Sequence, residues 1–151
     1  MKLTSFFIVA LIAIAMSGCS KKQLPSAIQV VPEGTFAGLF RRVHISGKTG
    51  VRDTLKANVQ LILDKTAGFS LTASNTSSVI VPSHGGYVID SNYILFNDIT
   101  YQVTASATPT DKVHLTGTYQ FYYNVNNKVF QMVNNSFLDT LSLQFDLKKT
   151  N

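Results

Sequence analysis

Apolar and polar residues alternate at every second position along most of the chain after residue 33. In the run HLTGTYQFYYNV, Leu115, Tyr119 and Phe121 fall on one side, and mostly polar residues occupy the other. Such alternation is typical of antiparallel strands that bury one face in a core. The pattern predicts an all-β domain with no amphipathic helix after residue 25. The expected strands cover residues 35–46, 55–64, 68–74, 86–90, 93–98, 100–107, 113–125 and 128–148.

Short turn-forming segments separate the expected strands, among them DKTAG (64–68) and SHGG (83–86). The runs GGYVID and YILFND are separated only by Ser91 and Asn92, which predicts a tight hairpin. The last expected strand allows a break at residues 134–136, where Asn-Asn-Ser is a turn signal. Because tight turns join consecutive strands, we expect an antiparallel meander of about eight strands that closes into a barrel. A β-sandwich is the alternative.

The first residues of the chain have the organisation of a secretory signal. Lys2 precedes the apolar run FFIVALIAIAM (6–16), and the small residues Ser17 and Gly18 follow it. This run is too short to span a bilayer comfortably, and its flanks match a cleavable leader. The pattern therefore predicts a signal peptide over residues 1–18.

The only cysteine of the chain, Cys19, directly follows this leader. The segment Met16-Ser17-Gly18-Cys19 resembles the lipobox of bacterial lipoproteins. The resemblance implies that the Cys19 thiol carries a diacylglycerol and that Cys19 becomes the new N-terminus. Two or more acyl chains anchor a protein stably, whereas one chain holds it only marginally. Ser20, in place of the Asp that favours inner-membrane retention in lipoproteins, implies the outer membrane and either its periplasmic or its surface-exposed face.

Residues 19–33 are expected to form a lipidated tether, since KKQLPSAIQVVPE contains two prolines and has no clear period. The remaining chain, 34–151, is long enough for one domain with a real core. Removing the leader with Lys2 leaves 12 basic and 8 acidic residues that are scattered along the chain. This distribution argues against nucleic acid as a partner, which would require a concentrated basic face. The absence of a second cysteine excludes a disulfide framework and a thiolate metal site.

Several motifs in the domain carry a resemblance to a known group of proteins. They include GTFAGLF (34–40), the pattern G-x-Y over Gly85-Gly86-Tyr87, and L-x-G-x-Y from Leu115 to Tyr119. With these motifs the chain looks like small envelope lipoproteins of the Bacteroidota, whose molecular roles are mostly not known. Those proteins are similar to calycins, so the resemblance implies a lipocalin-like barrel. The opening Gly-Thr-Phe also resembles the lipocalin G-x-W motif, with Phe in place of Trp.

The sequence offers little that would support catalysis or a cofactor. The histidines His44, His84 and His114 are 40 and 30 residues apart, which matches no metal motif. His44 and His114 fall on the polar sides of their expected strands and would converge only if those sides faced the lumen. No nucleophile elbow, P-loop or dinucleotide fingerprint is present. We therefore expect a non-enzymatic protein without a cofactor or a bound metal.

Two binding hypotheses remain, and both include the membrane as a partner through Cys19. In the first, the protein is a binding module that holds a small apolar or amphipathic ligand inside the barrel. The expected lining residues are Phe40, Arg42, Tyr119, Phe121 and Tyr123. In the second, a structural or accessory lipoprotein binds an envelope protein complex through its surface. An eight-stranded barrel has room for its own side chains or for one small ligand, so large inward side chains would weaken the first hypothesis.

Two short segments suggest covalent modification. Asp53-Thr54-Leu55 and Asp139-Thr140-Leu141 resemble the D-[S/T]-aliphatic signal for O-glycosylation in the Bacteroidota. The resemblance implies Thr54 and Thr140 as acceptor residues.

Overall fold

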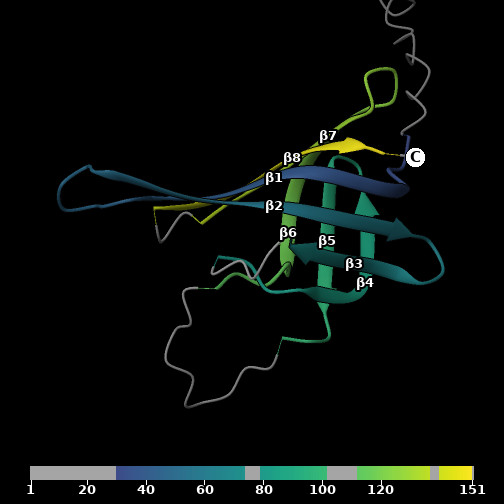
Figure 1. Ribbon diagram of the computed structural model, residues 1–151, viewed down its shortest axis with the longest axis horizontal. Coiled ribbons are helices and arrows are strands. Elements are labelled where there is room, and N and C mark those ends of the chain that lie inside the picture. Colours follow the sequence, from purple (N-terminus) through teal and green to yellow (C-terminus); the bar gives the residue numbers. More distant parts are fainter. Residues whose placement is uncertain (1–29, 74–78, 102–111, 137–139, 151) are drawn as a thin grey trace, which may run out of the picture.

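A computed structural model of the protein describes residues 30–73, 79–101, 112–136 and 140–150 (Figure 1). The expected signal peptide, Cys19 and the tether up to residue 29 lie outside the described residues. Within the described ranges, the secondary structure consists of eight β-strands and no helix. The strands are β1 (Gly34–Ile45), β2 (Arg52–Asp64), β3 (Gly68–Ala73), β4 (Ser83–Asp90), β5 (Tyr93–Asp98), β6 (Gly117–Asn124), β7 (Val129–Asn135) and β8 (Leu141–Lys149).

Each strand pairs antiparallel with the next one along the chain, from β1 to β8. β8 also pairs with β1, from Phe36 opposite Lys149 to His44 opposite Leu141, so the sheet closes on itself. The prediction of an antiparallel meander that forms a barrel is therefore confirmed. Figure 1 shows that β1 and β2 continue as a long hairpin beyond β3, β4 and β5, and β8 accompanies β1 as far as His44.

The sixth strand begins later than the alternation predicts. The expected strand covers 113–125, whereas β6 starts at Gly117. Gly117 has a φ of 86°, in the left-handed region that glycine adopts most readily, so the extended run is interrupted there. Leu115, two residues earlier, is nevertheless fully buried. The alternation thus identifies the buried side chains correctly, although a backbone turn shortens the strand.

Two other expected strands also differ from the structure. The expected strand 128–148 divides into β7 and β8, as the turn signal at 134–136 allows. At the start of the expected strand 100–107, Thr100 lies in a turn after β5 and Tyr101 belongs to no strand. Residues 102–107 lie outside the described residues.

The prediction of a turn at SHGG (83–86) is wrong, because these residues form the first half of β4. Gly85 is needed there for a close approach between strands and not for a turn. A Cβ atom at Gly85 would lie 2.0 Å from the backbone oxygen of Asn97 on β5. A glycine inside a strand often marks such an approach, and sequence alone does not distinguish it from a turn signal.

The turn between β2 and β3 lies in the DKTAG segment, as expected, and the Asp64 side chain holds it in place. One carboxylate oxygen of Asp64 accepts hydrogen bonds from the backbone N–H groups of Thr66 and Ala67, each 2.7 Å long. These two bonds hold the pKa of Asp64 below its usual value. Only Ser91 and Asn92 lie between Asp90 and Tyr93, so the predicted tight hairpin between β4 and β5 is confirmed.

Aromatic rings from several strands meet inside the barrel. Phe145 packs against Phe40 and Tyr119, with ring centroids 4.8 Å and 5.8 Å apart, and Tyr119 also meets Phe96 at 5.7 Å. Such edge-to-face and tilted contacts add to the stabilisation that comes from burial. The fully buried aromatic side chains are Phe36, Phe40, Phe96, Tyr119, Phe130 and Phe145.

Candidate functional site

Four of the five expected ligand-lining residues belong to this packed core. Phe40 and Tyr119 are fully buried, and Phe121 is almost so. Tyr123 is half-buried and meets Phe36 and Phe130 edge-on, with centroids 5.8 Å and 6.0 Å apart. These side chains fill the space that a ligand in the lumen would occupy.

The fifth expected lining residue, Arg42, lies on β1 in the part of the β1–β2 hairpin that extends beyond β3. It is half-buried and lines a hollow of about 210 Å³ together with His44, Asp53 and Leu55. In the β1–β2 register, Arg42 is opposite Leu55 and His44 is opposite Asp53. β3 pairs with β2 only from Val59 onward. The structure therefore separates Arg42 from the aromatic residues with which the sequence grouped it.

Among the described residues, the hydroxyls of Tyr87 and Tyr119 are buried and have no hydrogen-bond partner. Tyr87 is half-buried and packs against the core, whereas Tyr119 is fully buried inside it. Burial strongly raises the pKa of Tyr119, so the phenol remains neutral. A buried hydroxyl without a partner costs about 1–3 kcal/mol, so a water molecule or a polar ligand atom at this point would be favourable.

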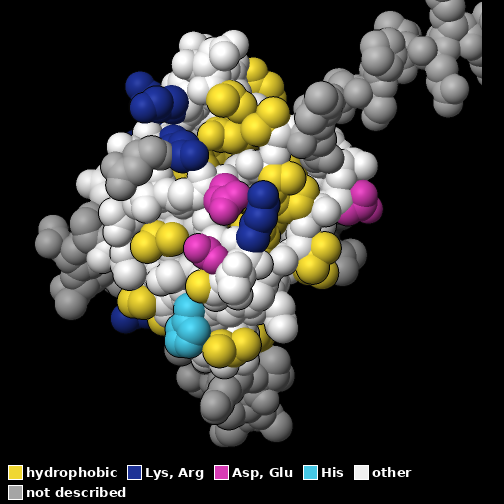
Figure 2. All heavy atoms as spheres, turned by 90° about the vertical axis from the view of Figure 1, so that its right-hand side faces the viewer, with side chains coloured by type: hydrophobic (Ala, Val, Ile, Leu, Met, Phe, Trp, Pro, Cys, Tyr) yellow, Lys and Arg dark blue, Asp and Glu magenta, His cyan; other side chains and the backbone are white. Residues whose placement is uncertain are grey.

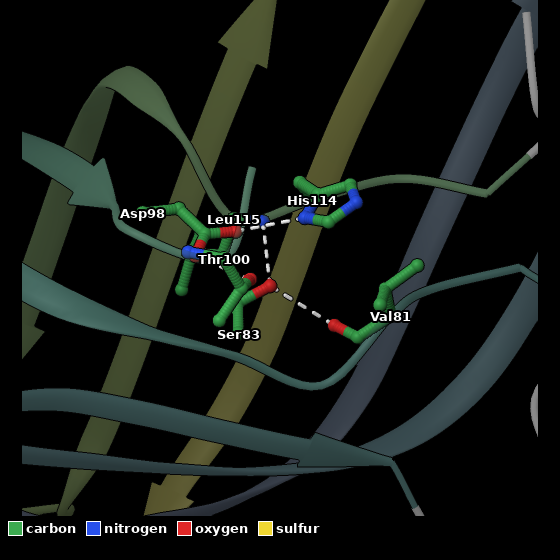
Figure 3. A network of polar contacts seen from close by, with 6 residues as sticks. All are labelled: Val81, Ser83, Asp98, Thr100, His114 and Leu115. Carbon is green, nitrogen blue, oxygen red and sulfur yellow. Dashed lines mark hydrogen bonds and ion pairs between the residues drawn. The ribbon is translucent and has the colours of Figure 1, made fainter. Parts of the chain in front are cut away.

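A second polar cluster lies where β4 begins and β5 ends (Figure 3). One carboxylate oxygen of Asp98 is 2.9 Å from Nδ1 of His114. The other accepts hydrogen bonds from the backbone N–H and the hydroxyl of Thr100, at 2.8 Å and 2.6 Å. The Asp98 side chain is completely buried, and the ring of Tyr101 packs against that of His114 at a tilt of 57°, with ring centroids 5.0 Å apart. Burial alone would raise the pKa of Asp98, but the hydrogen bonds from Thr100 and His114 outweigh it and lower that pKa.

Ser83 lies beside this pair, and the three residue types are those of a hydrolytic triad. In a triad, however, the serine hydroxyl is hydrogen-bonded to the histidine. The Ser83 hydroxyl instead donates to the carbonyl of Val81 at 3.0 Å and accepts from the N–H of Leu115 at 3.3 Å. Figure 3 shows that the hydrogen-bonded nitrogen of His114 points to Asp98 and not to Ser83. The hydrogen bonds therefore connect β4, the end of β5 and the segment before β6. We call the cluster of Ser83, Asp98, Thr100 and His114 the clasp.

Replacing Asp98 by asparagine should destabilise the protein by about 1–3 kcal/mol at neutral pH, because Thr100 and His114 lose a buried charged acceptor. The pKa of folded Asp98 lies below its ordinary value of 3.8. Its stabilisation is therefore complete above that value and is lost as the pH falls through the folded pKa. Urea unfolding between pH 7 and pH 2 measures both effects. The exposed Asp53→Asn is the matched control, and equal stability of the two variants would contradict the clasp.

The three histidines each have their own surroundings. His44 lies on β1, opposite Asp53 of β2 and Leu141 of β8. His84 is exposed on β4, and His114 belongs to the clasp. Within the described ranges, no group of three or more His, Cys, Asp or Glu side chains is arranged to hold a metal ion. In the same ranges, no helix has the length and apolar character of a membrane span.

The expected acceptor threonines lie on either side of β1. Thr54 is half-buried on β2 opposite Val43, and Thr140 is exposed just before β8. The carbonyl of Thr140 accepts a hydrogen bond from the N–H of Ile45 at 2.9 Å. Asp139, in the second motif, lies outside the described residues.

Large apolar side chains are exposed on the outer face of β4, β5 and β6. Val88 and Leu95 are directly opposite each other and are 64% and 49% exposed. Tyr93 and Tyr122 are also exposed on this face, and Tyr122 is 57% exposed. Contiguous exposed apolar surface is a common mark of an interaction site.

The end of the molecule that carries the β2–β3 turn has a mixed charge distribution. Figure 2 shows acidic and basic side chains next to each other near the middle of this face, with hydrophobic side chains around them. One such pair joins Lys65 and Glu33, whose charged atoms are 3.1 Å apart. Exposed pairs of this kind contribute little to stability, and they leave this face without one dominant charge.

No protein-family model, curated protein or solved structure matches the chain. Its function must therefore be argued from its own residues and geometry.

Sequence reasoning missed the pairing of Asp98 with His114. Asp98 ends β5, and its local contact is with Thr100 two residues later, from whose backbone N–H it accepts a hydrogen bond at 2.8 Å. Its second role depends on a histidine 16 residues away that no local pattern connects to it.

Proposed function

We propose that the protein is a lipid-anchored lipoprotein of the cell envelope, held at the outer membrane through Cys19, whose barrel binds a partner on its outer surface. In this proposal the barrel is a rigid, non-enzymatic scaffold. The anchor rests on the leader and the lipobox-like segment that ends at Cys19. The binding role rests on how the barrel is filled.

The observation that carries this proposal is the packing of the lumen. The side of each strand that carries the large apolar residues faces inward, since its members are buried: Leu115, Tyr119, Phe121 and Phe145. An eight-stranded barrel is just wide enough for side chains of this size. This packing favours a surface role over a ligand held inside. The exposed Val88, Leu95, Tyr93 and Tyr122 on the outer face add support, since they give a protein partner apolar surface to bury.

A small apolar or amphipathic ligand in the lumen is the second candidate. One specific observation favours it: the buried Tyr119 hydroxyl has no partner among the described residues. A ligand with one polar atom would satisfy that hydroxyl.

Phe145→Ala distinguishes the two candidates. Deleting this ring should destabilise the protein by about 3–5 kcal/mol and leave an apolar cavity beside Phe40 and Tyr119. Benzene, which enters engineered apolar cavities, should then raise the melting temperature of the variant and leave that of the wild type unchanged. Thermal unfolding with and without benzene measures both effects.

Tyr122→Ala is the matched control, because it removes an exposed ring from the outer face and should change stability by no more than about 0.5 kcal/mol. If benzene also stabilises the wild-type protein, the lumen has free apolar space and the second candidate is favoured.

A further inference from the structure

The outer surface carries an open hollow of about 370 Å³, with a mixed polar and apolar lining, across β6, β7, β8 and β1. Its volume lies in the range of small-molecule sites, about 300–1,000 Å³. We call it the outer hollow and define it by its polar side chains and one tyrosine, namely Arg41, Gln120, Tyr122, Gln131, Gln144 and Asp146. Phe121, Met132, Val133 and Phe145 complete its lining.

Strand register places these side chains in two adjacent rows. One row runs from Gln120 through Val133 and Gln144 to Arg41. The other runs from Tyr122 through Gln131 to Asp146. Because neighbouring strands are about 4.8 Å apart, the first row crosses about 14 Å of the barrel surface. The hollow is thus built on four rigid, hydrogen-bonded strands and not on loops.

Hydrogen bonds inside the hollow hold its side chains in place. Asp146 pairs with Arg41 through one carboxylate oxygen and accepts a 2.8 Å hydrogen bond from Gln131 through the other. The amide of Asn124 donates to the Tyr122 hydroxyl at 3.1 Å. Side chains that are fixed before binding lose less entropy when a ligand arrives.

The chemistry of the lining selects a particular kind of ligand. The guanidinium of Arg41 and the carboxylate of Asp146 neutralise each other, so the hollow has no net charge for an ion. The amides of Gln120, Gln131 and Gln144 each offer a donor and an acceptor, which matches a hydroxyl group. Tyr122 adds a ring that is 57% exposed and presents a flat apolar face.

We infer that the outer hollow is a binding site for a neutral, hydroxyl-rich ligand, namely a saccharide. A saccharide combines hydroxyl groups with apolar C–H faces, so it uses the amides and the tyrosine ring together. An anion would meet the Asp146 carboxylate, and an apolar ligand would bury the polar lining without partners. A peptide strand would need an open sheet edge, whereas β7 and β8 beneath the outer hollow are paired on both sides. This inference rests on the proposed surface role in that both place binding on the outside of the barrel, and it adds a saccharide to the protein partner proposed for the face of β4, β5 and β6.

The test uses the full-length protein, solubilised in a detergent without a sugar headgroup, on a printed array of neutral and acidic oligosaccharides. Wild-type protein should bind neutral saccharides. Tyr122→Ala and Gln131→Ala should each weaken that binding at least about tenfold. Tyr122→Phe keeps the ring and should bind within about threefold of wild type. Gln60→Ala removes an outward-facing glutamine of β2 outside the outer hollow, and it should leave binding unchanged.

Two results would overturn the inference. One is retention of no neutral saccharide by the wild type, and the other is equal binding by wild type, Tyr122→Ala and Gln131→Ala. Selective retention of acidic saccharides would also contradict the neutral site. None of these outcomes affects the proposed membrane anchor or surface role, which fail instead if Cys19 carries no lipid or if benzene finds space in the wild-type lumen.

Discussion

Cys19→Ala should release the protein from the membrane completely. In our proposal the Cys19 thiol is the attachment point of the diacylglycerol, and no other cysteine in the chain can replace it. Without lipid and with residues 1–18 removed, the remaining attraction is that of the lysines at 21–22 for anionic headgroups, at about 1 kcal/mol each. That is too little to hold a domain of this size. Membrane fractionation and metabolic labelling with an alkyne fatty acid measure the effect.

Ser20→Ala is the matched control, since it changes the neighbouring small residue and keeps the thiol. It should remain labelled and in the membrane fraction. Membrane retention of the unlabelled Cys19→Ala variant would contradict the anchor.

Gly38→Ala should abolish stable folding, with a cost of more than about 5 kcal/mol. A Cβ atom at Gly38 would lie 2.1 Å from the backbone oxygen of Asp146 and 2.9 Å from Cα of Leu147. Both atoms belong to β8, which closes the barrel against β1. Because backbone atoms of a paired strand cannot move aside without breaking the ladder, the methyl group should separate β1 from β8. Circular dichroism and urea unfolding give the measurement.

Gly86→Ala provides the control on the same sheet. A Cβ atom at Gly86 would have no neighbour within 4 Å, and its φ is not in the left-handed region. This variant should therefore stay within about 0.5 kcal/mol of wild type. Similar stability for Gly38→Ala and Gly86→Ala would contradict the close approach of β1 and β8.

The meander could be predicted because alternation and tight turns are local features. Phe69 and Leu71 on β3, or Ile94 and Phe96 on β5, show the period-two spacing of a strand in the sequence itself, and the structure buries all four. Glycines were harder to interpret, because a turn and a close approach look alike in one sequence. Gly85 lies inside β4, whereas Gly117 does interrupt a strand.

The polar sites could not be predicted, because they depend on register between distant strands. Arg41 and Asp146 are 105 residues apart, and only the closure of β1 against β8 brings them together. The sequence did show Arg41 and Arg42 side by side, but it could not place one in the outer hollow and the other near the hairpin. Asp98 likewise meets His114 only because the end of β5 lies beside the segment before β6.

The sequence also left open which side of each strand faces inward, and that choice bears on function. Tyr119 and Phe121 on β6 and Phe145 on β8 point inward, while Gln120 and Gln144 point outward. This arrangement places large rings in the lumen and amides on the surface. It supports a barrel that binds on its outside.

Native mass spectrometry of the full-length protein, extracted from its own envelope in detergent, tests this central claim most directly. We predict a lipid-modified chain that releases no further small molecule from the lumen on gentle activation. An apolar molecule retained at one copy per chain, and lost in Tyr119→Phe, would contradict the claim and place the ligand inside the barrel.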